Sequence, residues 1–412
     1  MNTTLGIPAA DLRSDLELYL DLHAHPELSG SEQRTADRFA ARLERLGCTV
    51  TRSVGGGHGL VGVLRNGHGP TVLLRAELDA LPVTERTGLR YASTVPGVMH
   101  ACGHDLHLAA LAGAVAVLAR TRDTWRGTVL VIGQPAEETL TGAQAMLADG
   151  LYERFGTPDA ALAQHAAPLP TGTVAYGADP RVPLMAGSTS VDVTIHGRGG
   201  HAGTPHLTVD PVLTAAATVL RLQSVVSRET APAEQAVLTV GFLRAGERGN
   251  VIPDAAQLSL CIRAFSQQAL DRMTAAAERI VRAECAASGC SDEPDFDVSA
   301  RSPVLLPDAV ASAAVRRVHE GLLGPERVLD CPAGTATEDF PWFGADGIPT
   351  VYWMLGVTGA VPWRTARAGG APVPANHAPE FAPDVRTALP TGIAAMATAA
   401  QSVLRTAKGT MS

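Results

Sequence analysis

The chain has 412 residues and a formal net charge of −8, and its composition is 46% hydrophobic and 18% charged. This composition is typical of a folded globular protein, and the length exceeds what one hydrophobic core usually serves, so two domains are expected. The negative charge, without any block of basic residues, argues against nucleic acid as a partner. Lys408 is the only lysine, which excludes Schiff-base catalysis and a Walker phosphate loop within the fold.

The cysteines and the N-terminal segment bear on the compartment. The six cysteines show neither a dense regular spacing nor a Cys-x-x-Cys pair, which favours a reducing compartment over a disulfide framework. Residues 1–13 lack the basic and apolar regions of a signal peptide, and no stretch reaches the roughly 18 apolar residues of a membrane helix. A cytoplasmic protein without a membrane partner is therefore expected.

The first 180 residues alternate between helical and strand patterns, which predicts a layered α/β domain. Apolar positions at spacings of three and four predict surface helices at residues 10–23 and 31–46. A buried helix is expected at residues 106–118. Short apolar runs bounded by turn residues predict buried strands at residues 72–74, 128–132 and 160–163.

From Gly187 to Val298 the pattern changes to the order β-α-β-β-α-β, which describes a ferredoxin-like unit. The expected strands and helices, in chain order, are residues 190–195, 209–227, 236–243, 257–265, 268–287 and 296–299. The α/β pattern then resumes with a helix near residues 308–322, a strand at 350–354 and a helix near 385–404. The fold class predicted is a mixed, mostly parallel α/β domain of residues 1–186 and 300–412, interrupted by an α+β domain of residues 187–299.

The most unusual segment reads His100-Ala101-Cys102-Gly103-His104-Asp105-Leu106-His107. Cysteine and histidine are ligands that zinc and its neighbours prefer, and a Cys-x-His pair on a turn can direct a sulfur and an imidazole to one point. A free cysteine is more often a small buried hydrophobic residue. The segment alone therefore leaves both interpretations open.

Other candidate ligands follow the predicted strands. Asp79, the pair Glu137-Glu138 and His165 each come after one strand, and His377 lies in a Gly-, Pro- and Ala-rich loop at residues 357–379. A loop of that length is usually functional or disordered, and the carboxyl ends of strands in an open α/β sheet converge on one crevice. Taken singly, the two glutamates are typical of the solvated N-terminus of a helix. A single His165 after a strand is more often a hydrogen-bonded residue at the edge of the sheet than a metal ligand. Together they suit one carboxylate that binds a metal and a neighbour that takes a proton from water.

Gly197-Arg198-Gly199-Gly200-His201-Ala202 formally satisfies a dinucleotide-binding fingerprint. We reject that function because the segment begins a domain, no acidic residue follows at the proper distance, and Pro205 interrupts the required helix. A glycine-rich turn that presents His201 is favoured. The chain also lacks the G-x-S-x-G and H-E-x-x-H motifs, which argues against serine hydrolases and zincins.

Four segments in chain order resemble the metal-dependent amidohydrolase family of aminoacylases and carboxypeptidases, in its branch of hippurate and auxin-conjugate hydrolases. They are residues 75–82, 100–107, 134–138 and 376–379. The likeness extends over nearly the whole chain and includes residues 199–202, 250–253 and 337–340.

This resemblance implies two divalent metal ions in the catalytic domain. The implied ligands are Cys102, His104, Glu138, His165 and His377. Glu137 is the implied general acid/base that activates metal-bound water, and Asp79 is expected to orient a ligand. His100, Asp105 and His107 are then expected to support the ligands from behind.

For the inserted domain, the resemblance implies a lid and a homodimerisation module. His201 is expected to reach the site of the partner subunit and to stabilise the oxyanion of the reaction. Asn250 and Arg263 are expected to hold the carboxylate of the substrate, and His206 to contact the substrate as well. A fork-shaped arginine suits bidentate capture of a carboxylate.

The predicted function is hydrolysis of the amide bond of N-acyl or N-aroyl amino acids. A dipeptidase or carboxypeptidase on the same site, and a catalytically silent protein that binds a carboxylated ligand, are the alternatives. Zinc is favoured over manganese, cobalt and nickel. Two departures from the family pattern are Glu77, where this branch usually has aspartate, and Ala166, where an aromatic or branched residue is common. With only 4% aromatic residues, the chain leaves the acyl pocket undefined.

Overall fold

The computed structural model describes residues 6–405, so Lys408 lies outside the described range. These residues form two compact units. Unit 1 consists of the described residues of Met1–Arg181, Pro307–Pro332 and Asp339–Ser412, and unit 2 of Val182–Leu306 and Ala333–Glu338. Unit 2 thus starts earlier and ends later than the predicted inserted domain, and it includes a short return segment. That segment is tied in by backbone hydrogen bonds of Gly334 with Leu184 and Ala186.

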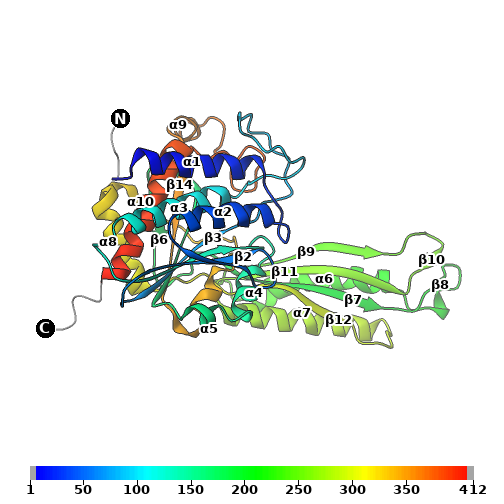
Figure 1. Cartoon of the computed structure of the whole chain (residues 1–412). Helices are drawn as coiled ribbons and strands as arrows, with labels where there is room; N and C mark the ends of the chain where they lie inside the picture. The colour runs from blue at the N-terminus through cyan, green and yellow to red at the C-terminus, as the bar shows by residue number, and fades with distance from the viewer. Residues whose placement is uncertain (1–5, 406–412) are drawn as a thin grey trace. The chain divides into compact units, whose positions relative to one another are not determined.

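Unit 1 contains an eight-stranded sheet of order β1-β2-β4-β3-β5-β14-β6-β13 (Figure 1). The strands are β1 Thr49–Val54, β2 Gly59–Asn66, β3 Thr71–Glu77, β4 Gly127–Gln134, β5 Ala160–Pro170, β6 Val174–Gly177, β13 Val328–Cys331 and β14 Thr350–Thr358. Four of the seven pairings are parallel, and they include the central run from β4 through β3 and β5 to β14. The predicted mixed, mostly parallel sheet is confirmed.

Helices of unit 1 pack on this sheet or on one another. They are α1 Ala9–Ala24, α2 Gln33–Arg45, α3 His104–Arg120, α4 Gly142–Ala148, α5 Leu151–Phe155, α8 Ala309–Leu323, α9 Ala360–Arg367 and α10 Val385–Arg405, with 3-10 turns η2 Pro325–Arg327 and η3 Phe340–Gly347. The five helices predicted for this domain are present. The prediction of one loop over residues 357–379 is wrong at its start, because β14 continues to Thr358 and α9 follows.

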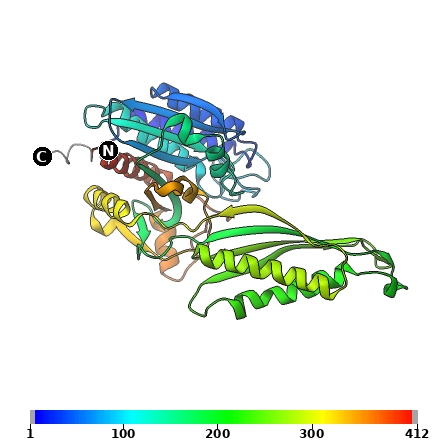
Figure 2. The same cartoon turned by 90° about the horizontal axis from the view of Figure 1, so that it is seen from below.

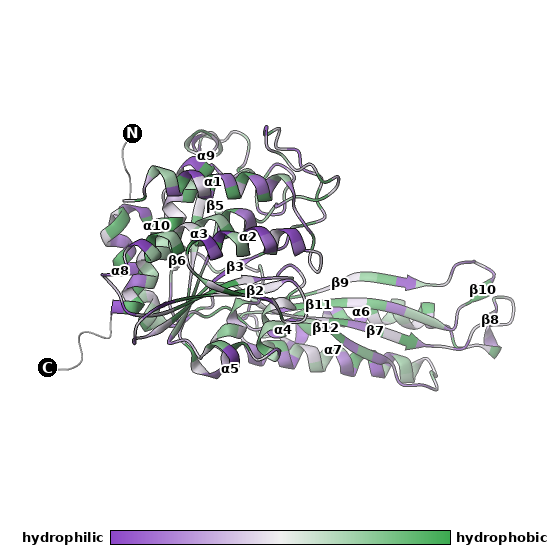
Figure 3. Ribbon diagram, in the orientation of Figure 1, coloured by the Kyte–Doolittle hydropathy of each residue, from purple (hydrophilic) through white to green (hydrophobic). Residues whose placement is uncertain are grey.

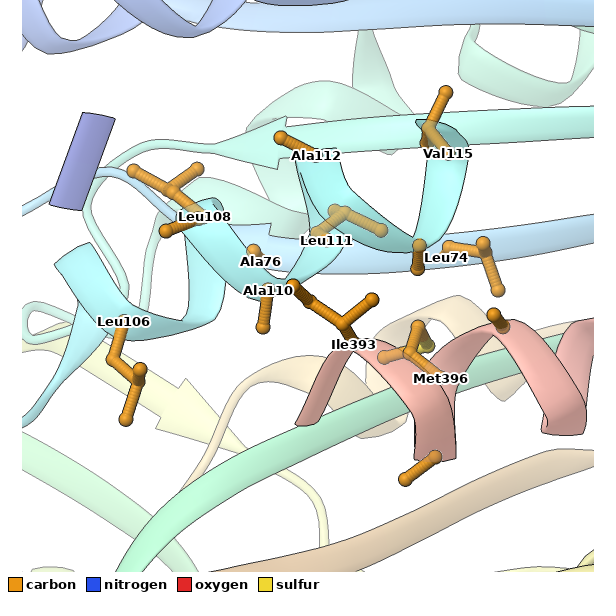
Figure 4. Close-up of a cluster of buried hydrophobic side chains, with 14 of the residues drawn as sticks. Leu74, Ala76, Leu106, Leu108, Ala110, Leu111, Ala112, Val115, Ile393 and Met396 are labelled. Atoms are coloured by element: carbon orange, nitrogen blue, oxygen red, sulfur yellow. The ribbon is translucent and has the colours of Figure 1, made fainter. Parts of the chain in front are cut away.

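The core of unit 1 forms where α3 and α10 pack against each other and against the sheet (Figure 4). Leu74 of β3, Leu111 of α3 and Ile393 of α10 are fully buried in one apolar cluster. A Cβ atom on Gly113 would lie 2.4 Å from Cδ1 of Ile393, so a glycine lets the two helices approach closely. Helix α3 is apolar nearly all round because it is covered on all sides.

Unit 2 contains a four-stranded antiparallel sheet of order β12-β7-β11-β9, and its two long helices cover one face of that sheet (Figure 2). The elements are β7 Gly187–His196, α6 Pro211–Glu229, β9 Ala236–Ala245, β11 Ala255–Ala264, α7 Gln267–Ala287 and β12 Asp295–Ser302. The predicted β-α-β-β-α-β order is confirmed. A small second sheet of β8 Gly200–His201 and β10 Val251–Ile252, beside the 3-10 turn η1 Pro205–Leu207, was not predicted.

Helix boundaries follow from capping and from amphipathic patterning. Side chains of Asp210 and Ser266 accept hydrogen bonds from backbone amides at the starts of α6 and α7. Outer helices such as α2 and α7 alternate hydrophilic and hydrophobic residues along their length (Figure 3). Among residues 6–405, no helix combines the length and the apolar character needed to cross a membrane.

Candidate metal centre

The candidate ligands of unit 1 gather at one edge of its sheet. Strands β4, β3 and β5 are adjacent and parallel, so the segments that follow β3 and β4 leave the same edge, as expected for such a sheet. Asp79 follows β3 by two residues and Glu137 follows β4 by three. His165 was expected to follow its strand, but it lies within β5, because that strand is longer than the apolar run that predicted it.

Cys102 lies at the centre of the cluster. Its Sγ atom is 3.4 Å from Nε2 of His165 and 3.3 Å from Nε2 of His377. The turn that carries the cysteine continues through Gly103, which has a φ of +85°. A Cβ atom at this position would lie only 2.9 Å from the Cβ atom of Ala166, so the turn needs glycine. His377 also has a positive φ, 69°, and its backbone N–H donates to the carbonyl of Ala101 at 2.8 Å. Strained backbone of this kind is common at functional sites.

The carboxylates of Glu137 and Glu138 lie close to the histidines of the same cluster. Nε2 of His104 is 3.8 Å from a carboxylate oxygen of Glu137 and 3.9 Å from one of Glu138. The same oxygen of Glu138 lies 3.4 Å from Nε2 of His377. The preceding residue, Ala136, has a φ of 53°, and its N–H donates to the carboxylate of the buried Glu32 at 2.9 Å. Glu32 therefore fixes the turn that presents both carboxylates.

The donor atoms of this cluster fit divalent cations. Nε2 of His104 and Oε1 of Glu138 are buried without a hydrogen-bond partner among the described residues, and such atoms require an explanation. The ligand atoms of Cys102, His104 and His165 lie within 4.8 Å of one another, as do those of Cys102, Glu138 and His377. A thiolate, imidazoles and a carboxylate form a donor set that zinc and related metals bind.

Charge interactions in the cluster also favour a bound cation. Burial raises the pKa of the Cys102 thiol, but the neighbouring histidines, led by His165, outweigh this and hold the pKa well below its usual value. Burial opposes protonation of His165, yet the Cys102 thiolate raises the pKa of that imidazole to about 9. The hydrogen bond to Cys102 and the nearby carboxylate of Glu138 raise the pKa of His377 to about 10. A bound cation would supply the positive charge that these protons carry.

Asp79 connects the two halves of the cluster. Its backbone carbonyl is 2.8 Å from Nδ1 of His104, and its carboxylate accepts hydrogen bonds from Ser29 Oγ at 2.7 Å and the Glu138 N–H at 2.9 Å. Sequence reasoning missed Ser29 and Glu32, because each stands in a segment without any motif.

Residues expected to support the ligands differ in their contacts. His107 bonds Glu77 and a backbone amide at distances of 2.6 and 2.7 Å. Asp105 faces away from the cluster and accepts from His23 at 2.6 Å. His100 is buried, and among the described residues neither of its ring nitrogens has a hydrogen-bond partner. Burial lowers its pKa to about 4.

The remaining predicted residues belong to unit 2 and lie at its two ends. His201 in β8 pairs with Val251 of β10, next to Asn250, whose carbonyl accepts from the Ala202 N–H. His206, in η1, is exposed nearby. Arg263 stands near the far end of β11, where it donates to the carbonyl of Thr335 at 2.7 Å. The strand from Ala255 to Arg263 spans about 26 Å.

Comparison with known proteins decides the family. The model of peptidase family M20/M25/M40 matches residues 73–402. The chain belongs to this family. It is a metal-dependent amide hydrolase, and the predicted resemblance to aminoacylases and amidohydrolases is confirmed.

Individual relatives of this M20-family hydrolase cover most of its length. N-acetyl-L-cysteine deacetylase from Bacillus subtilis (strain 168) is 34% identical over 349 residues, which are 83% of this chain and 80% of the relative. IAA-amino acid hydrolase ILR1-like 2 from Arabidopsis thaliana is 34% identical over 341 residues, 82% of this chain and 75% of the relative. The crystal structure of the Bacillus subtilis YXEP protein, described as a dinuclear metal binding peptidase from the M20 family, matches with a TM-score of 0.75 and 28% identity, covering 97% of this chain and 100% of that one.

Proposed function

We propose that this M20-family hydrolase cleaves the amide bond of N-acyl or N-aroyl amino acids, giving a carboxylic acid and a free amino acid. The observation that carries the proposal is the convergence of one thiol, three imidazoles and two carboxylates at the edge of the sheet of unit 1. The names of two relatives, a deacetylase of N-acetyl-L-cysteine and a hydrolase of IAA-amino acids, describe this class of substrate.

Two divalent metal ions would be held by the side chains that surround Cys102. The proposed ligands are Cys102, His104, Glu138, His165 and His377. Zinc is favoured because a thiolate stands among imidazoles, with manganese, cobalt and nickel as alternatives. When bound, such ions polarise a carbonyl and lower the pKa of water.

Glu137 would carry the protons of the reaction. Its side chain is nearly buried, at 5% exposure, and it lies beside His104 on a turn fixed by Glu32 and Asp79. A carboxylate in that position can take a proton from the attacking water and deliver it to the leaving nitrogen, so one group serves both steps. Asp79 would keep His104 and the Glu138 backbone in place for this chemistry.

Unit 2 would supply the remaining contacts to the substrate and form a homodimer. Arg263 and Asn250 are too far apart within one copy to hold one carboxylate, since about 26 Å of strand separates them. A second copy could bring Asn250, His201 and His206 to a site where Arg263 of the first copy binds, with His201 stabilising the oxyanion. The outer face of α6 exposes Leu213 and Leu220 at 68% and 77%, which suits an interface.

A cytoplasmic location is part of the same proposal. All six cysteines are unpaired thiols, and a reducing compartment keeps thiols in that state.

Metal analysis followed by a substrate panel tests the proposed activity. The purified protein should bind two divalent ions per chain and hydrolyse N-acetyl, N-benzoyl or indole-acyl amino acids faster than dipeptides with free amino termini. Preference for the free dipeptides would show a dipeptidase or carboxypeptidase instead. Binding of N-acyl amino acids without turnover would show a silent binding protein, and either result would contradict the proposal.

A further inference from the structure

A line of buried polar side chains runs behind the proposed metal ligands, and it begins at the end of β3. Glu77, the last residue of that strand, is fully buried and pairs with the guanidinium of Arg75. Residues i and i+2 of a strand lie on the same face, which makes this contact possible. Arg75 is itself held by Gln134 of β4 at 2.8 Å and by Asp339 at 2.9 Å. The position of the Glu77 carboxylate is therefore fixed from two neighbouring segments.

His107, in the first turn of α3, contacts the second carboxylate oxygen of Glu77. Its Nδ1 lies 2.6 Å from the Glu77 carboxylate, and its Nε2 lies 2.7 Å from the backbone N of Ala166. A peptide N–H can only donate, so Nε2 must accept and the proton must reside on Nδ1, where it is donated to Glu77. Both nitrogens of His107 are thus occupied, and the ring is not available to bind a metal.

The Ala166 amide is the point where this line meets the candidate ligands. The pairing of β3 with β5 ends at Arg75 and Ala163, so β3 offers no carbonyl to Ala166. Nε2 of His107 accepts the hydrogen bond of the Ala166 N–H instead. Ala166 directly follows His165, whose Nδ1 lies 2.9 Å from the Ala166 carbonyl and whose Nε2 faces Cys102. The Ala166 N–H and the Ala166 carbonyl lie on either side of one Cα atom, so a hydrogen bond that holds the N–H also restrains the backbone of Ala166, whose carbonyl directs the His165 imidazole.

We propose that Glu77 is a positioning residue for the ligand His165, and that it acts through His107 and the backbone of Ala166. The proposal rests on the proposed function, since it takes His165 as a metal ligand. Glutamate stands here where the resembling branch usually has aspartate, and in this chain one carboxylate oxygen contacts Arg75 and the other contacts His107. Partners behind metal ligands that fix ring orientation raise metal affinity about 10- to 100-fold.

Metal affinity of Glu77→Gln, measured by competition with a coloured chelator, tests this role without using turnover. An amide cannot accept from both Arg75 and His107 as the carboxylate does, so the dissociation constant for Zn²⁺ should rise about 10- to 100-fold for one of the two ions. Glu77→Asp keeps the charge and should recover most of that affinity. The absorption spectrum of the Co²⁺-loaded protein, which reports ligand geometry, should change in the Gln variant.

Asp15→Asn is the matched control, because Asp15 is another buried carboxylate paired with an arginine, Arg42. It should lower stability but leave the Zn²⁺ dissociation constant and the Co²⁺ spectrum unchanged. If the unmodified chain bound no divalent ion, the proposed function itself would fail. Two results would overturn the positioning role alone, provided that the unmodified chain bound two ions. One is that Glu77→Gln retained its affinity and spectrum, and the other is that Glu77→Asp lost as much affinity as Glu77→Gln. If Glu77→Gln did not fold, His107→Gln would take its place, with the same loss expected and unchanged affinity contradicting the proposal.

Discussion

Single buried side chains outside the candidate metal centre also have chemical consequences, and His319 of α8 is the clearest case. Its Nε2 lies 3.0 Å from the carbonyl of Ala395 and its Nδ1 lies 2.8 Å from the hydroxyl of Tyr176. The carbonyl can only accept, so Nε2 carries the proton and the Tyr176 hydroxyl donates to Nδ1. The ring is thus satisfied as a neutral imidazole between α8, α10 and β6, and burial lowers its pKa from 6.5 to about 4.

This histidine predicts a loss of stability in mild acid. Between pH 6.5 and 4 the unfolded chain binds a proton at this position and the folded chain does not, so stability falls as pH is lowered through that window. Going from pH 7 to pH 5 should remove about 2 kcal/mol. In urea unfolding at both pH values, His319→Gln should lose that much less than the unmodified chain. His68→Gln, which changes an exposed histidine, should behave as the unmodified chain, and equal losses in all three proteins would contradict the prediction.

At the scale of elements, most long segments were predictable from sequence, whereas the eight-residue strand β2 and several short elements were not. Helix α3 and strands β3 and β4 have sustained apolar patterns, and the structure places them within a few residues of the predicted bounds. Strand β1 alternates weakly and is half exposed, and α4 and α5 have seven and five residues, which is too short for a periodic signal. Tertiary contacts rather than local pattern determine such elements.

The start of α4 gives an element-scale prediction. A Cβ atom on Gly142 would lie 1.6 Å from the carbonyl oxygen of Pro135, in the segment that leads to Glu137. Gly142→Ala must therefore displace backbone, and we expect a loss of about 3 kcal/mol or more in the free energy of unfolding. Activity should fall as well, since the displaced turn presents both carboxylates.

Gly321→Ala is the matched control for this change. Gly321 is exposed in α8, and a Cβ atom there would meet nothing within 4 Å. Alanine favours the helix, so this variant should gain up to about 1 kcal/mol. Thermal or chemical unfolding of both variants measures the difference, and a similar effect at both glycines would show that the close approach at Pro135 has no energetic weight.

At the scale of the whole molecule, the sequence predicted two folds within one chain and the segments that meet at the candidate site. The convergence of Cys102, Glu138 and His377 follows from strand order and from the resemblance together, because no local pattern links residues so far apart. The sequence did not predict the return segment of residues 333–338 to unit 2, nor the separation of Arg263 from Asn250. Both depend on how distant segments pair.

A shared site predicts that two inactive variants can complement each other. His201→Ala retains Glu137 but lacks the imidazole that a partner would need, and Glu137→Gln has the opposite defect. Mixed dimers contain one complete site, so random mixing should restore roughly a quarter of the normal number of sites. The measurement is turnover after co-expression of two differently tagged chains. Activity no higher than the sum of the separate variants would argue against a site shared between copies.

The most direct test of the account is turnover and metal content of Glu137→Gln, measured on the same preparation. The amide keeps the size of the side chain but cannot take a proton from water. We predict two bound divalent ions per chain, as in the unmodified protein, with hydrolysis of the best N-acyl amino acid reduced by at least about 100-fold. Turnover near the unmodified rate with both ions in place would contradict the assignment of Glu137 as the proton carrier.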